Sequence, residues 1–163
     1  MSKKPRIRSI LAIAALSAAA AVAVAGGGSL EGQWLLEKQS YGSGKADQAQ
    51  IAGPLGIEFY REGERLAGRI RFGGISAEPV PWPSLVQAPV QELQVVVSPA
   101  EDRVRARYRT EPTPGEDVVL EVTEEYRVTD GGTALSGTVT VAILRGGEPG
   151  GSYVIQRRFR REP

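Results

Sequence analysis

Apolar and polar residues alternate along most of the chain after residue 26. Leu66, Ile70 and Phe72 fall on one side of an extended chain, and the arginines between them fall on the other. The run 103–109 repeats the pattern, with arginine at every second position. A period of two is typical of β-strands that bury one face. The sequence therefore predicts a protein built mainly from half-buried strands.

Eight such runs are separated by short segments rich in glycine, proline and aspartate, which are typical of hairpin turns. Short links make consecutive strands antiparallel neighbours, and eight of them can close into a barrel without edge strands. We therefore predict an all-β fold, an eight-stranded antiparallel up-and-down (lipocalin-like) barrel or a half-open barrel, although alternation alone does not distinguish a barrel from a sandwich. The predicted strands are Leu30–Gln39, Leu55–Arg61, Arg65–Phe72, Leu93–Ser98, Arg103–Thr110, Asp117–Val128, Thr133–Leu144 and Ser152–Arg160.

One segment, from Gly73 to Gln91, interrupts the alternation with four prolines and Trp82. Proline cannot donate to a β-ladder, so this segment is not expected to be a central strand. Long connections in compact domains often carry function. Two interpretations follow: a lid that places Trp82 over the mouth of the barrel, or a plug in which Trp82 and Leu85 extend the core.

Residues 1–25 have the pattern of an export signal. Four basic residues in the first eight precede an uncharged, alanine-rich run, and Ala23-Val24-Ala25 supplies the small residues that signal peptidase requires. We predict cleavage before Gly26, a mature domain over residues 26–163, and a periplasmic or secreted protein. The alternative is an uncleaved anchor, but the run is shorter than a membrane-spanning helix requires, so no transmembrane segment is expected after cleavage.

The composition restricts the classes of function. The full chain carries 20 basic and 19 acidic residues, but four basic residues lie in the signal, which leaves 16 against 19 and a net charge of −3. This balance gives no reason to expect a nucleic-acid partner. Histidine and cysteine are absent, so the usual general base and the preferred zinc ligands are missing. We expect no metal and no cofactor, and an enzyme would have to rely on carboxylates, lysine, serine or tyrosine.

The first and last strands carry a further signal. Gly32-Gln33-Trp34 lies in the first strand, and the last strand ends in the run Arg157 to Arg161. This combination resembles the calycin superfamily, and lipocalins in particular. The resemblance implies that the first and last strands pair and that a basic residue stacks on the tryptophan. Arg157 shares the inward phase of the last strand, and a cation over an indole is favourable. We therefore expect Gly32, Trp34 and Arg157 to close the barrel.

The sixth predicted strand carries glutamates on both of its faces, and each face suggests a different role. Glu124 falls in the inward phase, where a carboxylate needs a partner. It is expected to anchor a polar group of a ligand or to pair with an inward arginine, unless a bulge turns it outward. Outward-facing Glu121 and Glu125 are predicted to lie beside Arg107 and Arg103, respectively, in a solvated, charge-paired sheet face.

These patterns favour a non-enzymatic, exported binding protein. A barrel of this size can hold one small ligand or fill with side chains. The partner expected is a small apolar or amphipathic molecule. The alternative is a structural or protein-interaction domain of the envelope with a solid core and an envelope protein as its partner. The residues expected to line the ligand site are Phe72, Trp82, Tyr108, Glu124, Tyr126 and Tyr153.

Overall fold

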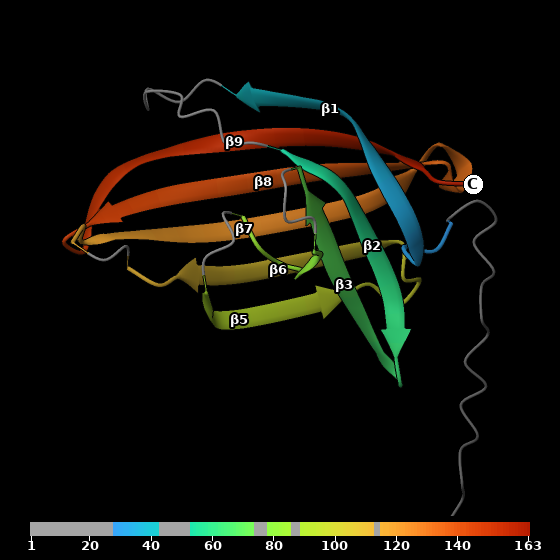
Figure 1. Cartoon of the computed structure of the whole chain (residues 1–163), viewed down its shortest axis with the longest axis horizontal. Helices are drawn as coiled ribbons and strands as arrows, with labels where there is room; N and C mark the ends of the chain where they lie inside the picture. The colour runs from blue at the N-terminus through green and yellow to red at the C-terminus, as the bar shows by residue number, and fades with distance from the viewer. Residues whose placement is uncertain (1–27, 43–52, 74–77, 86–88, 113–114) are drawn as a thin grey trace, which may run out of the picture.

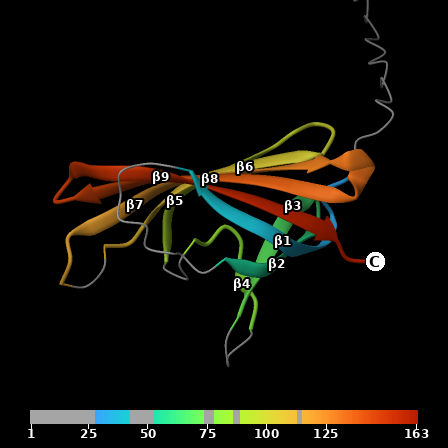
Figure 2. The same cartoon turned by 90° about the horizontal axis from the view of Figure 1, so that it is seen from above.

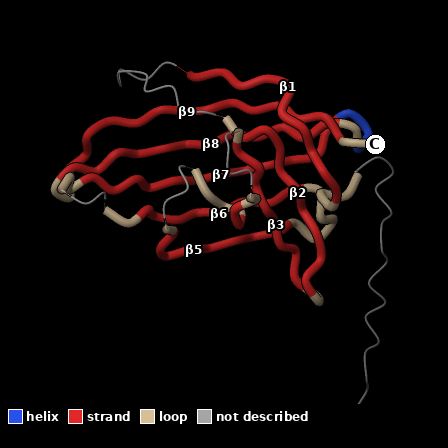
Figure 3. Tube along the Cα trace, viewed as in Figure 1, coloured by secondary structure: helices blue, strands red, loops and turns tan. Residues whose placement is uncertain are grey.

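A computed structural model of the chain describes residues 28–42, 53–73, 78–85, 89–112 and 115–163. The predicted signal segment, residues 1–25, lies outside the described residues. Nine antiparallel strands form the described structure, together with one short 3-10 helix, η1 (Asp130–Gly132) (Figure 3). The strands are β1 (Gly32–Gly42), β2 (Pro54–Glu62), β3 (Arg65–Phe72), β4 (Val80–Pro81), β5 (Val90–Val97), β6 (Arg103–Thr110), β7 (Val118–Thr129), β8 (Ala134–Arg145) and β9 (Glu148–Arg161).

The nine strands form one sheet in the order β4-β3-β2-β1-β9-β8-β7-β6-β5. The sheet curls, so that β2 and β3 cross in front of β6 and β5 (Figure 1), and the β2–β3 hairpin and β4 lie on one side of the layer formed by β6 to β9 (Figure 2). The result is an all-β, antiparallel, up-and-down half-barrel. The predicted fold class is confirmed, and its half-open form is the one observed.

The strand count differs from the prediction because β4 was not foreseen. This strand is only two residues long, and it adds to the outer edge of β3 within the proline-rich segment. Proline is tolerated at a sheet edge, where its missing N–H is not needed. The two edges of the sheet are β4 and β5, so the sheet does not close on itself.

The first strand, β1, pairs with the last strand, β9, as expected from the sequence, although the sheet stays open at β4 and β5. The β1–β9 ladder runs from Trp34 opposite Arg161 to Gly42 opposite Val154, with an irregularity between Leu36 and Lys38. The first half of β1 pairs with β2 as well. Because β1 contacts both neighbours, it is the strand at which the sheet turns from its β9 side to its β2–β3 side.

The connection between β8 and β9 is tighter than predicted. The glycine-rich run 146–151 was expected to be a loop, but β9 begins at Glu148 and extends to Arg161. Only Gly146 and Gly147 form the turn, and both adopt positive φ angles, of 58° and 81°. Glycine reaches these angles without steric cost. A two-residue turn therefore lets the last hairpin continue further than composition suggested.

The charged face has a register different from the predicted one. Arg109 lies opposite Glu121 and Arg105 opposite Glu125, while Arg107 faces Thr123. The predicted pairing was therefore wrong by two residues, because alternation fixes the face of each residue but not its partner. The ion pairs still form: Arg105 Nη2 lies 2.6 Å from Glu125 Oε2, and Arg109 contacts Glu121.

One cluster of side chains fills the concave face of the half-barrel. It joins the β2–β3 hairpin to the layer of β6 to β9, and it includes Trp82 and Leu85, which are 9% and 2% exposed. These two residues are therefore part of the core, as the plug interpretation expected. Four aromatic rings (Phe59, Trp82, Tyr126 and Phe159) meet edge to face, with centroids 5.3–6.3 Å apart. Such contacts add about 0.5–1.5 kcal/mol per pair beyond area burial.

Candidate binding site

A buried polar network lies at the centre of this core. Glu124 is fully buried, and its carboxylate accepts three hydrogen bonds. Tyr108 Oη donates to Oε1 at 2.5 Å, while Trp82 Nε1 and Tyr126 Oη each donate to Oε2 at 3.1 Å. The donors come from three separate parts of the chain: the segment after β4, β6 and β7. The network therefore fixes the proline-rich segment against the sheet.

Arg157 on β9 supplies the positive charge opposite Glu124. Its Nη1 donates to Tyr126 Oη at 3.0 Å and its Nε donates to the Gln39 side chain at 2.8 Å. Arg157 is 4% exposed, and among the described residues its Nη2 has no hydrogen-bond partner. Tyr126 thus joins the two buried charges through a single hydroxyl group. The direct pair between Glu124 and an inward arginine, one of the roles expected for Glu124, is not observed; Tyr126 bridges the two charges instead.

Burial controls the protonation of these groups. It raises the pKa of Tyr108 and the pKa of Tyr126 above the ordinary tyrosine value, and the nearby Glu124 charge raises both further. Both phenols therefore stay protonated and available as donors. Burial alone would lower the pKa of Arg157, but Tyr126 and Glu124 outweigh it and the pKa is raised. Arg157 therefore remains charged.

The cation over Trp34 is Arg161 and not Arg157. The Arg161 guanidinium carbon lies 4.2 Å from the indole centroid, and Arg161 also donates to the backbone carbonyls of Gly132 and Glu31. The physical reason is the register of β1 against β9. Trp34 lies opposite Arg161, while Arg157 lies opposite Gln39, five residues after Trp34 on β1. The expected contact between a C-terminal arginine and the first-strand tryptophan is therefore present, with a different arginine.

Gly32 has a role in this arrangement. Its φ is +131°, and a Cβ added there would lie 2.7 Å from Arg161 Nη1. A side chain at this position would both strain the backbone and push the guanidinium away from the indole.

The predicted ligand-lining residues fall into two groups. Trp82, Tyr108, Glu124 and Tyr126 meet in the buried network, where their side chains contact one another. Phe72 and Tyr153 are only partly buried and pack against the edge of the core cluster. The interior around the network is thus filled by the side chains that were expected to surround a ligand.

An open groove lies between the β2–β3 hairpin and β5, and it has a volume of about 650 Å³. Its apolar walls are formed by Leu66, Trp82, Leu93, Val95 and Val97. The rim is charged, and an ion pair between Arg61 on β2 and Glu101 in the β5–β6 turn spans it. Pockets for small ligands usually measure about 300–1,000 Å³ and combine apolar walls with a few polar groups. The volume of this groove lies in that range, and its apolar residues lie beside five charged residues.

Sequence reasoning missed the groove and the part that Gln39 and Arg161 play. One signal was present: 93–97 is apolar at both inward and outward positions, apart from Gln94, which is unusual for a half-buried strand. A second signal was phase, since Arg161 shares the inward phase of Arg157 and Phe159. No local signal marked Gln39, which becomes a partner of Arg157 only through the pairing of β1 with β9.

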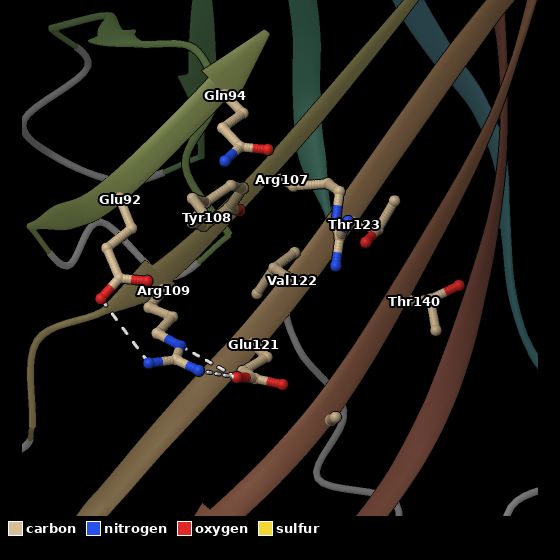
Figure 4. Close-up of a pocket in the computed structure, with 10 residues that line it drawn as sticks. Glu92, Gln94, Arg107, Tyr108, Arg109, Glu121, Val122, Thr123 and Thr140 are labelled. Carbon is tan, nitrogen blue, oxygen red and sulfur yellow. Dashed lines mark hydrogen bonds and ion pairs between the residues drawn. The ribbon is translucent and has the colours of Figure 1, made fainter.

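A second, smaller hollow of about 280 Å³ lies on the convex face, where β5, β6, β7 and β8 meet (Figure 4). Arg109 there is held by Glu121 and Glu92. Arg107 lies beside Thr123 and makes no ion pair within the described residues. The lining is polar and the charges are exposed, so this hollow has less capacity to hold an apolar group than the groove has.

The described residues contain no cluster of three or more acidic side chains that could hold a metal ion. In the same ranges, no helix combines the length and hydropathy needed to cross a membrane. No protein-family model, curated protein or solved structure matches the chain. Fold and site geometry are therefore the basis on which a function can be proposed.

Proposed function

We propose that this protein is an exported, non-enzymatic binding protein that holds a small apolar or amphipathic molecule in the groove between the β2–β3 hairpin and β5. The observation that carries the proposal is the combination of apolar walls and charged rim in a groove of ligand-sized volume. Trp82 lines the groove, and its indole N–H donates to Glu124 of the buried network, which holds the ring in place.

The groove favours an amphipathic ligand over a purely apolar one. An apolar portion would contact Leu66 and Val95, while a polar portion would meet the charges of Arg61 and Glu101 at the rim. Removing apolar surface from water contributes roughly 25 cal/mol per Å². The rim charges would add orientation more than affinity, because exposed ion pairs contribute little.

Ligand binding is tested by fluorescence, since the chain has two tryptophans and only Trp82 lies in the groove. A Trp34→Phe variant leaves Trp82 as the single reporter. Titration with dodecanoate or with anilinonaphthalene sulfonate should give a saturable change with one site per chain. Native mass spectrometry of protein purified without denaturation should show a co-purifying small molecule.

A matched pair of variants locates the site. Leu66→Glu places a charge in the groove wall, and Leu55→Glu places the same charge on β2, at a position 59% exposed and outside the groove. We expect affinity for dodecanoate to fall at least tenfold, or about 1.4 kcal/mol, only for the first variant. Near-ultraviolet circular dichroism checks that both fold. The absence of saturable binding, or an equal loss in both variants, would reject the proposal.

The proposed location is the periplasm or the extracellular medium. It is supported by the basic residues at the amino terminus and the alanine-rich run within residues 1–25. Amino-terminal sequencing of the exported protein should begin at Gly26. Retention of the uncleaved chain in the membrane fraction would instead indicate an anchor.

The filled interior favours a second candidate, a protein-interaction domain of the envelope with a solid core. The edge-to-face contacts of Trp82, Tyr126 and Phe159 give the core its rigidity, and no ligand would be needed to complete it. This candidate predicts that no small molecule co-purifies and that crosslinking in intact cells attaches the protein to an envelope protein.

A further inference from the structure

The edge strand β5 leaves apolar side chains in solvent on both of its faces. Leu93 and Val95 are 48% and 42% exposed on the groove side, and Val96 is 66% exposed on the convex side. β5 is the outermost strand of the sheet (Figure 1), and within the described part of the chain only β6 pairs with it. Edge strands are normally protected by charges, prolines or bulges. An apolar edge of this kind is suited to pairing with another strand.

The backbone of β5 sets which groups are free to pair. Ser98 N–H donates to the Arg103 carbonyl at 2.9 Å, so these two residues form a hydrogen-bonded pair. Such pairs alternate with non-bonded pairs along an antiparallel ladder, which makes Val97 and Val95 the non-bonded positions. Their N–H and C=O groups therefore point away from β6, toward the free edge.

The regular part of the strand is short. The ladder with β6 shifts register between Gln91 and Gln94, and Glu92 in this bulge has a φ of +52°. Beyond the bulge, the segment Leu93–Val97 is the part of the free edge that can take a partner in regular register. Its central residue is Val95.

We propose that two copies of this protein pair antiparallel through β5, with the two-fold axis at Val95. This register uses the whole regular segment and makes Val95 of each copy bond with Val95 of the other. It places Leu93 opposite Val97 of the second copy, so the groove side of the joint is apolar throughout. The two half-barrels then share one continuous sheet.

Charge on the convex side fits the same register. Glu92 of one copy lies in the bulge just beyond the regular segment, near Ser98 of the other, and Arg103 lies directly behind Ser98 on β6. Adjacent strands are about 4.8 Å apart, so the two long side chains can meet across the small serine. Arg103 has no ion pair within the described residues, and Glu92 is held only loosely by Arg109 at 3.6 Å. The second copy therefore supplies a carboxylate to an exposed arginine.

Three other arginines of β6 lie on this side of the joint, and Arg107, behind Gln94, makes no ion pair within the described residues. Arg105 is already paired with Glu125, and Arg109 with Glu121. A joint of five residues per copy buries less than the roughly 1,200 Å² of a standard interface, so the dimer should be weak and depend on concentration. The inference does not rest on the proposed ligand, because association and ligand binding are measured separately.

The absence of cysteine from the chain allows a sharp test. Val95→Cys places one thiol on the two-fold axis, where Cα atoms of a hydrogen-bonded pair lie about 5.5 Å apart, within the roughly 4.4–6.8 Å range of disulfides. Val96→Cys, the more exposed neighbour, faces Gln94 of the second copy instead. With oxidised glutathione we expect the V95C protein to form covalent dimers at least about tenfold faster than the V96C protein. Equal rates, or a faster V96C protein, would overturn the register.

Sedimentation velocity of the unmodified protein tests association itself. We expect the weight-average sedimentation coefficient to rise with concentration, and a monomer at all concentrations up to about 1 mM would overturn the dimer. Glu92→Arg should weaken association, and adding Arg103→Glu in the same chain should restore it. Failure of the double variant to recover association would contradict the proposed charge pair. Leu55→Lys, a charge on an exposed apolar position away from β5, should leave association unchanged.

Discussion

Glu124 and Arg157 are two buried, opposite charges that meet through the hydroxyl group of Tyr126. Tyr126 donates to the carboxylate at 3.1 Å and accepts from the guanidinium at 3.0 Å. The two charged residues lie on β7 and β9, with β8 between them. Each charge therefore depends on the other for compensation, although they share no direct ion pair.

Removing one of these charges should cost more than removing both. Breaking a buried pair by removing one partner typically costs about 3–5 kcal/mol, because the other charge is left uncompensated. We expect Arg157→Met and Glu124→Gln each to lower the free energy of unfolding by about this amount. The double variant should lose clearly less than the sum. Urea unfolding of all four proteins measures the coupling.

Arg160→Met is the control for this cycle, since Arg160 is an exposed arginine on the same strand. It should change the free energy of unfolding by under about 0.5 kcal/mol. Additive effects of the two core substitutions would show that the charges act independently.

High pH should unfold the protein through Tyr108 and Tyr126. Burial and the charge of Glu124 raise the pKa of each phenol in the folded state, while in the unfolded chain it is about 10. The folded state therefore holds protons that the unfolded state releases. Stability is complete below pH 10 and falls above it, by up to about 2.7 kcal/mol per pH unit for two groups.

Absorbance at 295 nm measures this ionisation directly. Of the five tyrosines, Tyr108 and Tyr126 should titrate only as the protein unfolds. Urea unfolding between pH 8 and pH 11 should show the matching loss of stability. A reversible titration of all five tyrosines near pH 10 with the fold intact would contradict the prediction.

Arg161 should stabilise the pairing of the first strand, β1, with the last, β9. It lies over Trp34 and donates to the backbone carbonyls of Gly132 and Glu31. Loss of the cation–π contact and of these bonds predicts a decrease of about 1–3 kcal/mol for Arg161→Ala. Arg161→Lys keeps the charge but not the planar fork of donors, so it should recover only part. Arg160→Ala is the matched control and should have little effect on thermal unfolding.

Gly137 should be needed to accommodate the ring of Tyr126. A Cβ at this position would lie 2.4 Å from Tyr126 Cε1, so Gly137→Ala must displace the ring that joins the two buried charges. Overpacking of a core typically costs about 1–3 kcal/mol. Gly42→Ala is the control, because its nearest contact would be 3.6 Å, from Val154. Equal unfolding midpoints for the two variants would show that the ring has room to move.

The fold class could be predicted because strand formation and burial depend on local alternation. A period of two assigns each residue to a face regardless of its neighbours, so most strands and the inward position of Glu124 followed from the alternation. The pairing of the first strand with the last was instead implied by the resemblance to the calycin superfamily. The lining residues Trp82, Tyr108 and Tyr126 were selected on the same basis. Their contact with one another in a filled core was an alternative that the pattern left open.

What sequence alone determined was therefore the class of fold, the faces of its strands and the inward positions of Glu124 and Arg157. Tertiary structure decided the register of β6 against β7, the choice of Arg161 over Arg157 at Trp34, the open sheet with β5 at its edge, and the groove. The physical reason is that alternation repeats every two residues, so registers that differ by two place the same side chains on the same face. Only the packing of distant strands, with its specific hydrogen bonds and ring contacts, selects one of them.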